Sequence, residues 1–367
     1  MTLSPQHRAD IQGLRAVAVI AVIAGHLFPS AIKGGFVGVD IFFVISGFVI
    51  TQQMAKLHAK SPHTFLRDFY SRRIKRIVPA ALLVTISTIV ATSYFLGPVA
   101  ANGAKLDGAW VSIFLGNFHF QEVAVDYFSA GTRTSPLQHY WSLSIEEQFY
   151  LIWPALFLLL MLKVRNKLTQ LCVIGFIIVL SLSTALYKAE ISAQPIFFMS
   201  STRLWELACG AALALSAKSI RFPKLLTYLC LSVFIVSSLF IEPTMQWPSL
   251  QTLPVIIATL LLLAHNSRIA PNRLLQNRIL VYLGDISYVL YLWHWPIFTI
   301  YRAYVTTYGP TEKIYTILAT VALSVATHHF IENPIRFSKQ VSPVLSISIG
   351  VSAIAATSGL LFISYQG

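Results

Sequence analysis

Long apolar windows recur along the whole chain, and they limit its possible folds more than any other feature. A membrane-spanning helix needs about 20 mostly apolar residues. Of the 367 residues, 56% are hydrophobic and only 11% are charged, with a mean hydropathy of +0.68, whereas soluble domains carry roughly 25% charged residues. The sequence therefore predicts an all-α, polytopic transmembrane helix bundle. The apolar windows cover approximately 14–32, 35–55, 77–97, 107–120, 146–164, 168–188, 202–217, 225–241, 250–265, 284–304, 313–331 and 343–364.

The charges between the windows predict the topology. Basic loops follow the second, fifth, seventh, ninth and eleventh windows, and cytoplasmic loops of membrane proteins are enriched in Lys and Arg. If all five loops are cytoplasmic, the short window 107–120 cannot cross, and it is re-entrant or lies on the outer face. This arrangement predicts about eleven spans with a cytoplasmic N-terminus. The same loops explain the net charge of +13, so we expect membrane lipid around the chain and no nucleic-acid partner.

Two ionisable residues lie in the first apolar window, "LRAVAVIAVIAGHLF". Arg15 and His26 are eleven residues apart, which on a helix is about 20° from three whole turns and a rise of about 16 Å. The spacing predicts that both side chains share one helix face, with Arg15 near the cytoplasm and His26 past the middle of the membrane. Alone, Arg15 is equally explained as a membrane-end anchor, and His26 as a histidine hydrogen-bonded between helices.

Asp40 lies about one helical turn inside the second span, in "GGFVGVDIFFVISGF". The short turn between the two spans predicts that Asp40 lies at a depth close to that of His26. A carboxylate beside an imidazole fixes its tautomer and raises its basicity, as a general base requires. Asp40 also suits a cap of its own first helical turn. Gly34, Gly35 and Gly38 permit close approach of helices.

Six blocks occur in an order that is similar to one family of membrane enzymes. They are "RADIQGLRAVAVIAVIAGH", "GGFVGVDIFFVISGFVIT", "FYSRRIKRIVPA", "WSLSIEEQFYLIWP", "YVLYLWHWPI" and "FIENPIRF". The chain resembles the membrane acyltransferase family type 3, which includes bacterial O-antigen and peptidoglycan O-acetyltransferases. The resemblance implies a multi-pass protein of the bacterial inner membrane. It would move an acetyl group from cytoplasmic acetyl-CoA to a hydroxyl of a surface glycan, such as lipopolysaccharide O-antigen.

The resemblance also implies roles and boundaries. Arg15 and His26 match the family's essential motif of Arg, ten residues, then His. Residues 1–337 would form the transmembrane acyltransferase domain. Residues 338–367 would add a C-terminal span that leads to a periplasmic SGNH-type domain, a partner that these 367 residues do not include.

"SRRIKRIVPA" is a basic cluster at the start of the third window. Positive-inside anchoring alone explains such a cluster. In the family reading, Arg72, Arg73 and Arg76 contact the phosphates of the acyl donor, for which the guanidinium fork is well suited. Pro79 is predicted in the first turn of this span, where its missing N–H is tolerated.

"QHYWSLSIEEQFY" contains a helix-start signal. Ser144 and Glu147 have the Ser-x-x-Glu spacing of a capping box, which predicts a structural role for Glu147. Glu146 points about 100° away, and it is a candidate to take a proton, to orient the acceptor hydroxyl or to pair with Arg203. His139 and Trp141 precede it and are candidates to line an acceptor cleft, although a tryptophan here also fits an interfacial belt.

Two further candidates come from later spans. Arg203 and Glu206 lie one turn apart in "STRLWELACG" and predict an i,i+3 ion pair, which either braces the bundle or lines the site. His294 lies between two tryptophans in "YLWHWP", where aromatic rings suit stacking on a sugar or an adenine but equally anchor a span end.

Two function classes remain after the motif search. The sequence has no P-loop, no zinc signature and no Gly-x-Ser-x-Gly elbow, so ATP hydrolysis, metal catalysis and a serine nucleophile are disfavoured, and we expect no metal. In an acyltransferase, His26 would take the proton of the acceptor hydroxyl or carry the acyl group itself. The alternative is an ion-coupled transporter or flippase with a relay of buried His, Glu and Arg residues.

Overall fold

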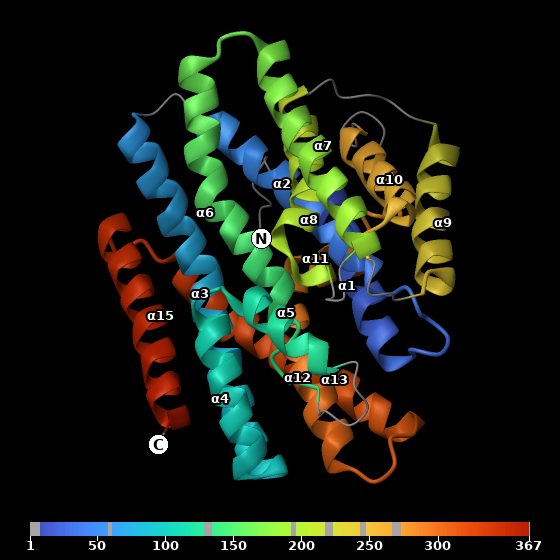
Figure 1. Cartoon of the computed structure of the whole chain (residues 1–367), viewed down its shortest axis with the longest axis vertical. Helices are drawn as coiled ribbons and strands as arrows, with labels where there is room; N and C mark the ends of the chain where they lie inside the picture. The colour runs from blue at the N-terminus through green and yellow to red at the C-terminus, as the bar shows by residue number, and fades with distance from the viewer. Residues whose placement is uncertain are drawn as a thin grey trace. The chain divides into compact units, whose positions relative to one another are not determined.

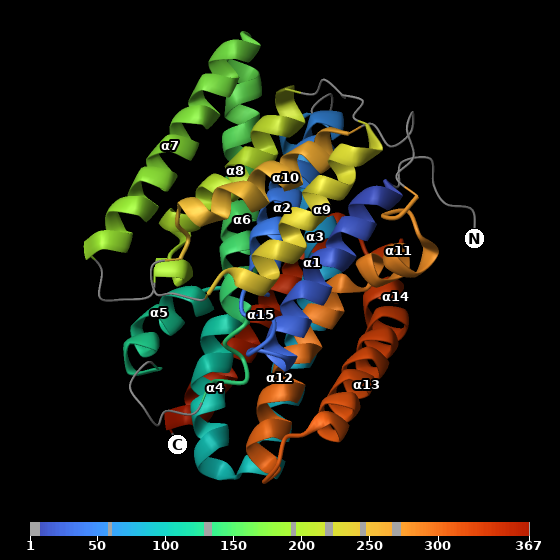
Figure 2. The same ribbon diagram turned by 90° about the vertical axis from the view of Figure 1, so that its right-hand side faces the viewer.

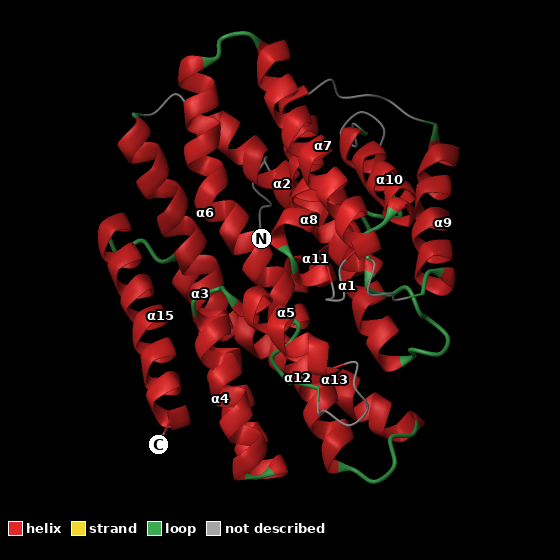
Figure 3. Cartoon of the chain, in the orientation of Figure 1, coloured by secondary structure: helices red, strands yellow, loops and turns green. Residues whose placement is uncertain are grey.

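The structure is a computed structural model of the chain. It describes residues 8–57, 61–127, 134–191, 196–216, 223–242, 247–265 and 273–366. The basic loop after the seventh window and much of the loop after the ninth lie outside these ranges. Within them the secondary structure is helical, without strands (Figure 3), so the predicted all-α class is confirmed.

Each of the eleven windows that were expected to cross coincides with one helix. These helices are α1 (Ala9–Leu27), α2 (Val37–Leu57), α3 (Pro62–Leu96), α6 (Tyr140–Lys163), α7 (Lys167–Ile191), α8 (Ser200–Ser216), α9 (Lys224–Phe240), α10 (Leu253–Ala264), α12 (Ser287–Tyr304), α13 (Pro310–Thr327) and α15 (Pro343–Gln366). The remaining described elements are α4 (Pro98–Ser112), α5 (Gly116–Tyr127), α11 (Arg278–Asp285), α14 (Asn333–Phe337), the 3-10 helices η1 (Ile196–Phe198) and η2 (Leu250–Thr252), and the π-helix η3 (His328–Glu332).

Seven described helices are long and apolar enough to cross a membrane: α1, α2, α3, α6, α7, α15, and α13 together with η3 and α14. Two more, α9 and α10, are apolar but shorter. The chain is thus a helical protein with several candidate membrane spans. The expected total of about eleven remains a prediction.

The window 107–120 does not form one helix. It contains the end of α4, a break, and the start of α5. At the break Phe114 has a φ of +56°, a left-handed conformation that is uncommon for a bulky residue. The Gln148 amide on α6 donates to the Phe114 carbonyl at 3.0 Å, which helps to hold the reversal. A single crossing helix over this window is therefore excluded.

The chain divides into two compact units. The first comprises Met1–Ala55, Leu160–Ser192 and Ser201–Tyr288, and the second comprises Lys56–Leu159, Ala193–Ser200 and Val289–Gly367. The first holds most of α1, α2 and α7 to α11, and the second holds α3 to α6 and α12 to α15.

Glycines bring backbones together in the first unit. A Cβ on Gly38 of α2 would lie 2.3 Å from the Ala18 carbonyl of α1. A Cβ on Gly47 would lie 1.8 Å from the Leu207 carbonyl of α8. The helix α2 thus packs with direct backbone contact against both α1 and α8, and the expected close approach at Gly38 is confirmed. In the same unit, α9 and α10 lie side by side (Figure 2).

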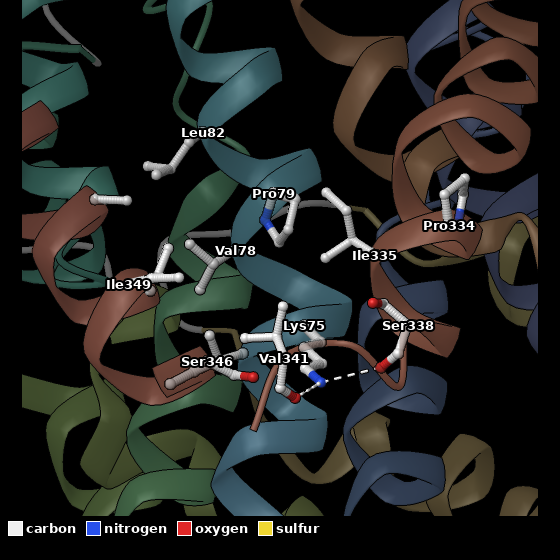
Figure 4. Close-up of a pocket in the computed structure, with 13 residues that line it drawn as sticks. Lys75, Val78, Pro79, Leu82, Pro334, Ile335, Ser338, Val341, Ser346 and Ile349 are labelled. Carbon is white, nitrogen blue, oxygen red and sulfur yellow. Dashed lines mark hydrogen bonds between the residues drawn. The ribbon is translucent and has the colours of Figure 1, made fainter. Parts of the chain in front are cut away.

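In the second unit, α3 packs against both α4 and α15, and the three helices run side by side (Figure 1). Lys75 of α3 donates to the carbonyls of Ser338 and Val341 at 3.1 and 3.0 Å, just before α15 begins. Above this contact α3, α14 and α15 enclose a mostly apolar groove of about 450 Å³ (Figure 4). Lys75 is the only acid or base among its lining residues, so we place no chemistry in it.

Candidate active site

The first helix, α1, has the geometry predicted for Arg15 and His26. Because α1 is continuous from Ala9 to Leu27, Arg15 and His26 stay three turns apart on nearly the same face. Both side chains are half-buried. Arg8, the N-cap residue of this helix, donates to the carbonyls of Leu263 and His265 at the end of α10.

Asp40 belongs to a buried ion cluster in the first unit. Its carboxylate lies 2.6 Å from the Arg203 guanidinium, and the Trp247 indole donates to the same oxygen at 3.4 Å. The same guanidinium lies 3.1 Å from Glu206. The Asp40, Arg203 and Glu206 side chains are at most 1% exposed. The predicted i,i+3 pair is therefore confirmed, and it includes a third charge from α2.

Two ionised carboxylates facing one guanidinium would leave one negative charge unbalanced within this cluster. Burying an uncompensated charge is costly, by several kcal/mol on the order-of-magnitude scale of buried ions. Asp40 contacts Arg203, Trp247 and also Glu206. An orienting role for Asp40 toward His26 stays a prediction.

Arg73 is held by α6 in the second unit. Its guanidinium lies 3.3 Å from Glu147 and 3.5 Å over the centre of the Tyr150 ring. The Tyr150 hydroxyl donates to Glu146 at 3.4 Å. Arg73 and Glu147 are only 12% and 13% exposed. Of the other two arginines, Arg72 is exposed and Arg76 is half-buried.

The predicted capping box is wrong. The helix α6 begins at Tyr140, so Ser144 lies in its second turn. The Ser144 hydroxyl donates to the Tyr140 carbonyl at 3.0 Å. Glu147 instead forms the ion pair with Arg73. The predicted place of Pro79 is also wrong, because α3 begins at Pro62 and Pro79 lies inside it.

Two buried histidines meet in the second unit. The rings of His139 and His294 lie 5.5 Å apart and nearly perpendicular. His139 Nε2 lies 3.0 Å from the Leu292 carbonyl, and His294 Nδ1 lies 2.6 Å from the Tyr291 carbonyl. A carbonyl only accepts, so these nitrogens carry the proton when each ring is neutral. The Tyr291 hydroxyl donates to the His139 carbonyl at 3.0 Å.

Trp141 lies close to this pair in sequence but contacts other aromatic residues. It packs edge-on against Phe197 and Phe198, each with its ring centre 5.6 Å away. Sequence reasoning missed Trp247, Tyr150 and Tyr291. No spacing signal links these residues to their partners, apart from the i,i+4 step between Glu146 and Tyr150 and the i,i+3 step between Tyr291 and His294.

These features define a class: a multi-pass helical protein with buried ionisable side chains on several helices. The acyltransferase domain family matches residues 8–329, and the chain belongs to this family. It is 34% identical over 353 residues to the peptidoglycan O-acetyltransferase OatA of Listeria monocytogenes, covering 91% of this chain and 56% of that protein. It is 32% identical to the putative peptidoglycan O-acetyltransferase YrhL of Bacillus subtilis, covering 89% of this chain and 54% of that protein.

The O-acetyltransferase OatA of Staphylococcus aureus is 32% identical over 357 residues, which cover 91% of this chain and 58% of that protein. The chain thus spans a little more than half the length of these curated relatives. No solved structure matches the chain. The suspected family is confirmed, and the activity of the longer relatives is carried over only as a proposal.

Proposed function

We propose that the chain is an integral-membrane O-acetyltransferase. It moves an acetyl group from cytoplasmic acetyl-CoA to a hydroxyl of a surface glycan, either peptidoglycan or lipopolysaccharide O-antigen. The observation that carries the proposal is family membership over residues 8–329, together with the half-buried Arg15 and His26 on one face of α1. The transporter alternative is not favoured, since the named relatives are O-acetyltransferases.

The proposed topology has eleven spans in the inner membrane, a cytoplasmic N-terminus and the end of α15 outside. Five contacts within the units support this topology. Every one of these contacts joins two segments that the topology places on the same side of the membrane. At the cytoplasmic side Arg8 meets the end of α10, Lys167 meets Ser216, and Lys75 meets Ser338. At the outer side Lys33 meets Glu242, and Lys105 meets Ser364.

The residues have distinct roles in the proposed reaction. Arg15, Arg72, Arg73 and Arg76 bind phosphates of the donor on the cytoplasmic side. His26 removes the proton of the acceptor hydroxyl or carries the acetyl group, and Asp40 and Glu146 assist this proton transfer. The acceptor contacts His139, Trp141, Arg203, Glu206 and His294. Residues 1–337 form the acyltransferase domain, and the span over 338–367 leads toward a periplasmic SGNH-type partner.

His26→Ala tests the proposal. General acid–base catalysis contributes about 10²–10⁴-fold, so the variant should lose acetyl transfer by at least about 100-fold while keeping wild-type abundance in the membrane. The measurement is mass spectrometry of O-acetyl groups on peptidoglycan and on lipopolysaccharide, from cells with the gene, without it and with the variant. An acetylation pattern that does not depend on the gene would contradict the function, and normal acetylation by the variant would remove His26 from the mechanism.

A further inference from the structure

A third histidine of the second unit has the surroundings of a general base. His119 Nε2 on α5 lies 2.7 Å from one carboxylate oxygen of Asp107 on α4. The Ser135 hydroxyl donates to the other carboxylate oxygen at 2.5 Å. The indole of Trp110 stacks parallel to the imidazole, with 5.8 Å between ring centres and 4° between planes. Contacts from two helices and a loop therefore fix the position of the ring.

The contacts also fix the tautomer. An ionised carboxylate only accepts hydrogen bonds, so Nε2 carries the proton and Nδ1 keeps a lone pair when the ring is neutral. Within the described part of the chain, the hydrogen bond of this ring is the one from Nε2 to Asp107. His119 and Asp107 keep 8% and 15% of their side-chain surface exposed. A carboxylate that orients an imidazole whose second nitrogen is free is the arrangement of a general base.

The depth of the pair follows from the packing of α4 on α15. Lys105 donates to the Ser364 carbonyl, and the Ser358 hydroxyl donates to the Ala109 carbonyl. Asp107, halfway between these two α4 residues, is thus level with about residue 361 of α15. That level is about 27 Å along α15 from Pro343, at about 1.5 Å per residue, and Pro343 lies beside the contact of Lys75. The pair therefore lies near the far edge of a hydrocarbon core about 30 Å thick, opposite the basic cluster.

Ser135 also connects the pair to α12, the helix that carries His294. Trp295, next to His294 on α12, donates from its indole to the Ser135 carbonyl at 2.9 Å. Tryptophan combines an apolar ring with one polar N–H, which suits places where one end of the side chain is wet. The strained Phe114 lies between α4 and α5, and strain of this kind clusters at functional sites.

We infer that the Asp107–His119 pair is a second general-base site, on the outer side, for the hydroxyl of the glycan acceptor. This inference rests on the proposed function, in the form in which His26 carries the acetyl group. His119 Nδ1 takes the proton of the acceptor R–OH as its oxygen attacks the carbonyl carbon of the acyl-imidazole. The new C–O bond forms, the bond from the acetyl carbon to the imidazole nitrogen breaks, and the proton passes to that nitrogen. Asp107 is a positioning residue.

The test uses right-side-out membrane vesicles that contain the full chain and are loaded with radiolabelled acetyl-CoA. The readout is base-labile label in the glycan of the vesicle. We expect His119→Ala and His119→Gln each to lower labelling by about 100-fold or more. External imidazole should restore part of the activity of His119→Ala but not that of His119→Gln, which leaves no room for it. Asp107→Asn should lower labelling by at least about tenfold, since the amide no longer fixes the tautomer.

The matched control is His329→Ala, which removes an exposed histidine of the same unit and should leave labelling unchanged. Abundance in the membrane and thermal stability are measured for each variant, because His119 also ties α5 to α4. A loss of less than about threefold in His119→Gln would overturn the inference, as would a loss in His119→Ala that imidazole does not relieve. Vesicles of the wild-type chain that transfer no acetyl would instead overturn the proposed function itself.

Discussion

Arg203 is the residue on which the buried charges of the first unit depend, because it faces both Asp40 and Glu206. Arg203→Met should destabilise the protein by about 3–5 kcal/mol, the effect of removing one partner from a buried pair. Glu206→Gln leaves one carboxylate for one guanidinium. It should change stability by no more than about 1 kcal/mol, the scale of a single hydrogen bond. The measurement is the free energy of unfolding in detergent, and equal losses in both variants would refute the charge imbalance.

The basic cluster allows a second test with a single residue. Arg73 is bound by Glu147 and Tyr150, so its removal would disturb α3 and α6 whatever it binds. Arg72 is exposed, so its replacement distinguishes binding of the donor from membrane anchoring. If the cluster binds the donor, Arg72→Ala should raise the apparent KM for acetyl-CoA several-fold with little change in kcat. An unchanged KM, with Lys339→Ala as the control for a lost exposed charge, would leave only an anchoring role.

At the scale of elements, the contact between α2 and α8 depends on two glycines, Gly47 of α2 and Gly210 of α8. A Cβ on Gly47 would lie 1.8 Å from the Leu207 carbonyl, and one on Gly210 would lie 2.0 Å from the Val44 carbonyl. These contacts involve backbone atoms and cannot be relieved by a side-chain rotation. Gly47→Ala should therefore lower stability by about 1–3 kcal/mol, the usual cost of overpacking.

Gly175 on α7 provides the matched control, since a Cβ there would meet nothing within 4 Å. Gly175→Ala should keep stability or raise it by up to about 1 kcal/mol, because alanine favours the helix more than glycine does. Thermal unfolding of both variants under the same conditions gives the comparison. A Gly47→Ala protein as stable as Gly175→Ala would mean that α2 and α8 are not in backbone contact.

Hydropathy predicts the presence of each helix better than it predicts the residue at which the helix begins. Each of the eleven windows expected to cross holds a helix, because a long apolar segment must satisfy its own backbone hydrogen bonds in lipid. The starts of α3 and α6 were missed, since polar residues upstream of both windows are also helical. Long-range partners were missed for a different reason. Asp40 and Trp247 are 207 residues apart, and no local pattern encodes such a contact, whereas the i,i+3 pair of Arg203 and Glu206 was visible.

At the scale of the whole molecule, the same-side contacts make the proposed topology testable with one chemical probe. The three native cysteines are first replaced by serine, and single cysteines are then placed at exposed connections. A membrane-impermeant maleimide added to intact spheroplasts should label the outer positions, Lys33→Cys and Val99→Cys. It should label the cytoplasmic positions, Arg165→Cys and Lys339→Cys, only after the membrane is opened.

This pattern follows from the charges, because basic loops stay in the cytoplasm and each crossing reverses the side. Val99 is the critical position, because it lies at the start of α4. In the proposed topology the segment of α4 and α5 does not cross the membrane, so it begins and ends on the outer side. Labelling of Lys33→Cys but not of Val99→Cys in intact spheroplasts would show an odd number of crossings between them. That result would refute the proposed order of spans, and with it the placement of Asp107 and His119 on the outer side.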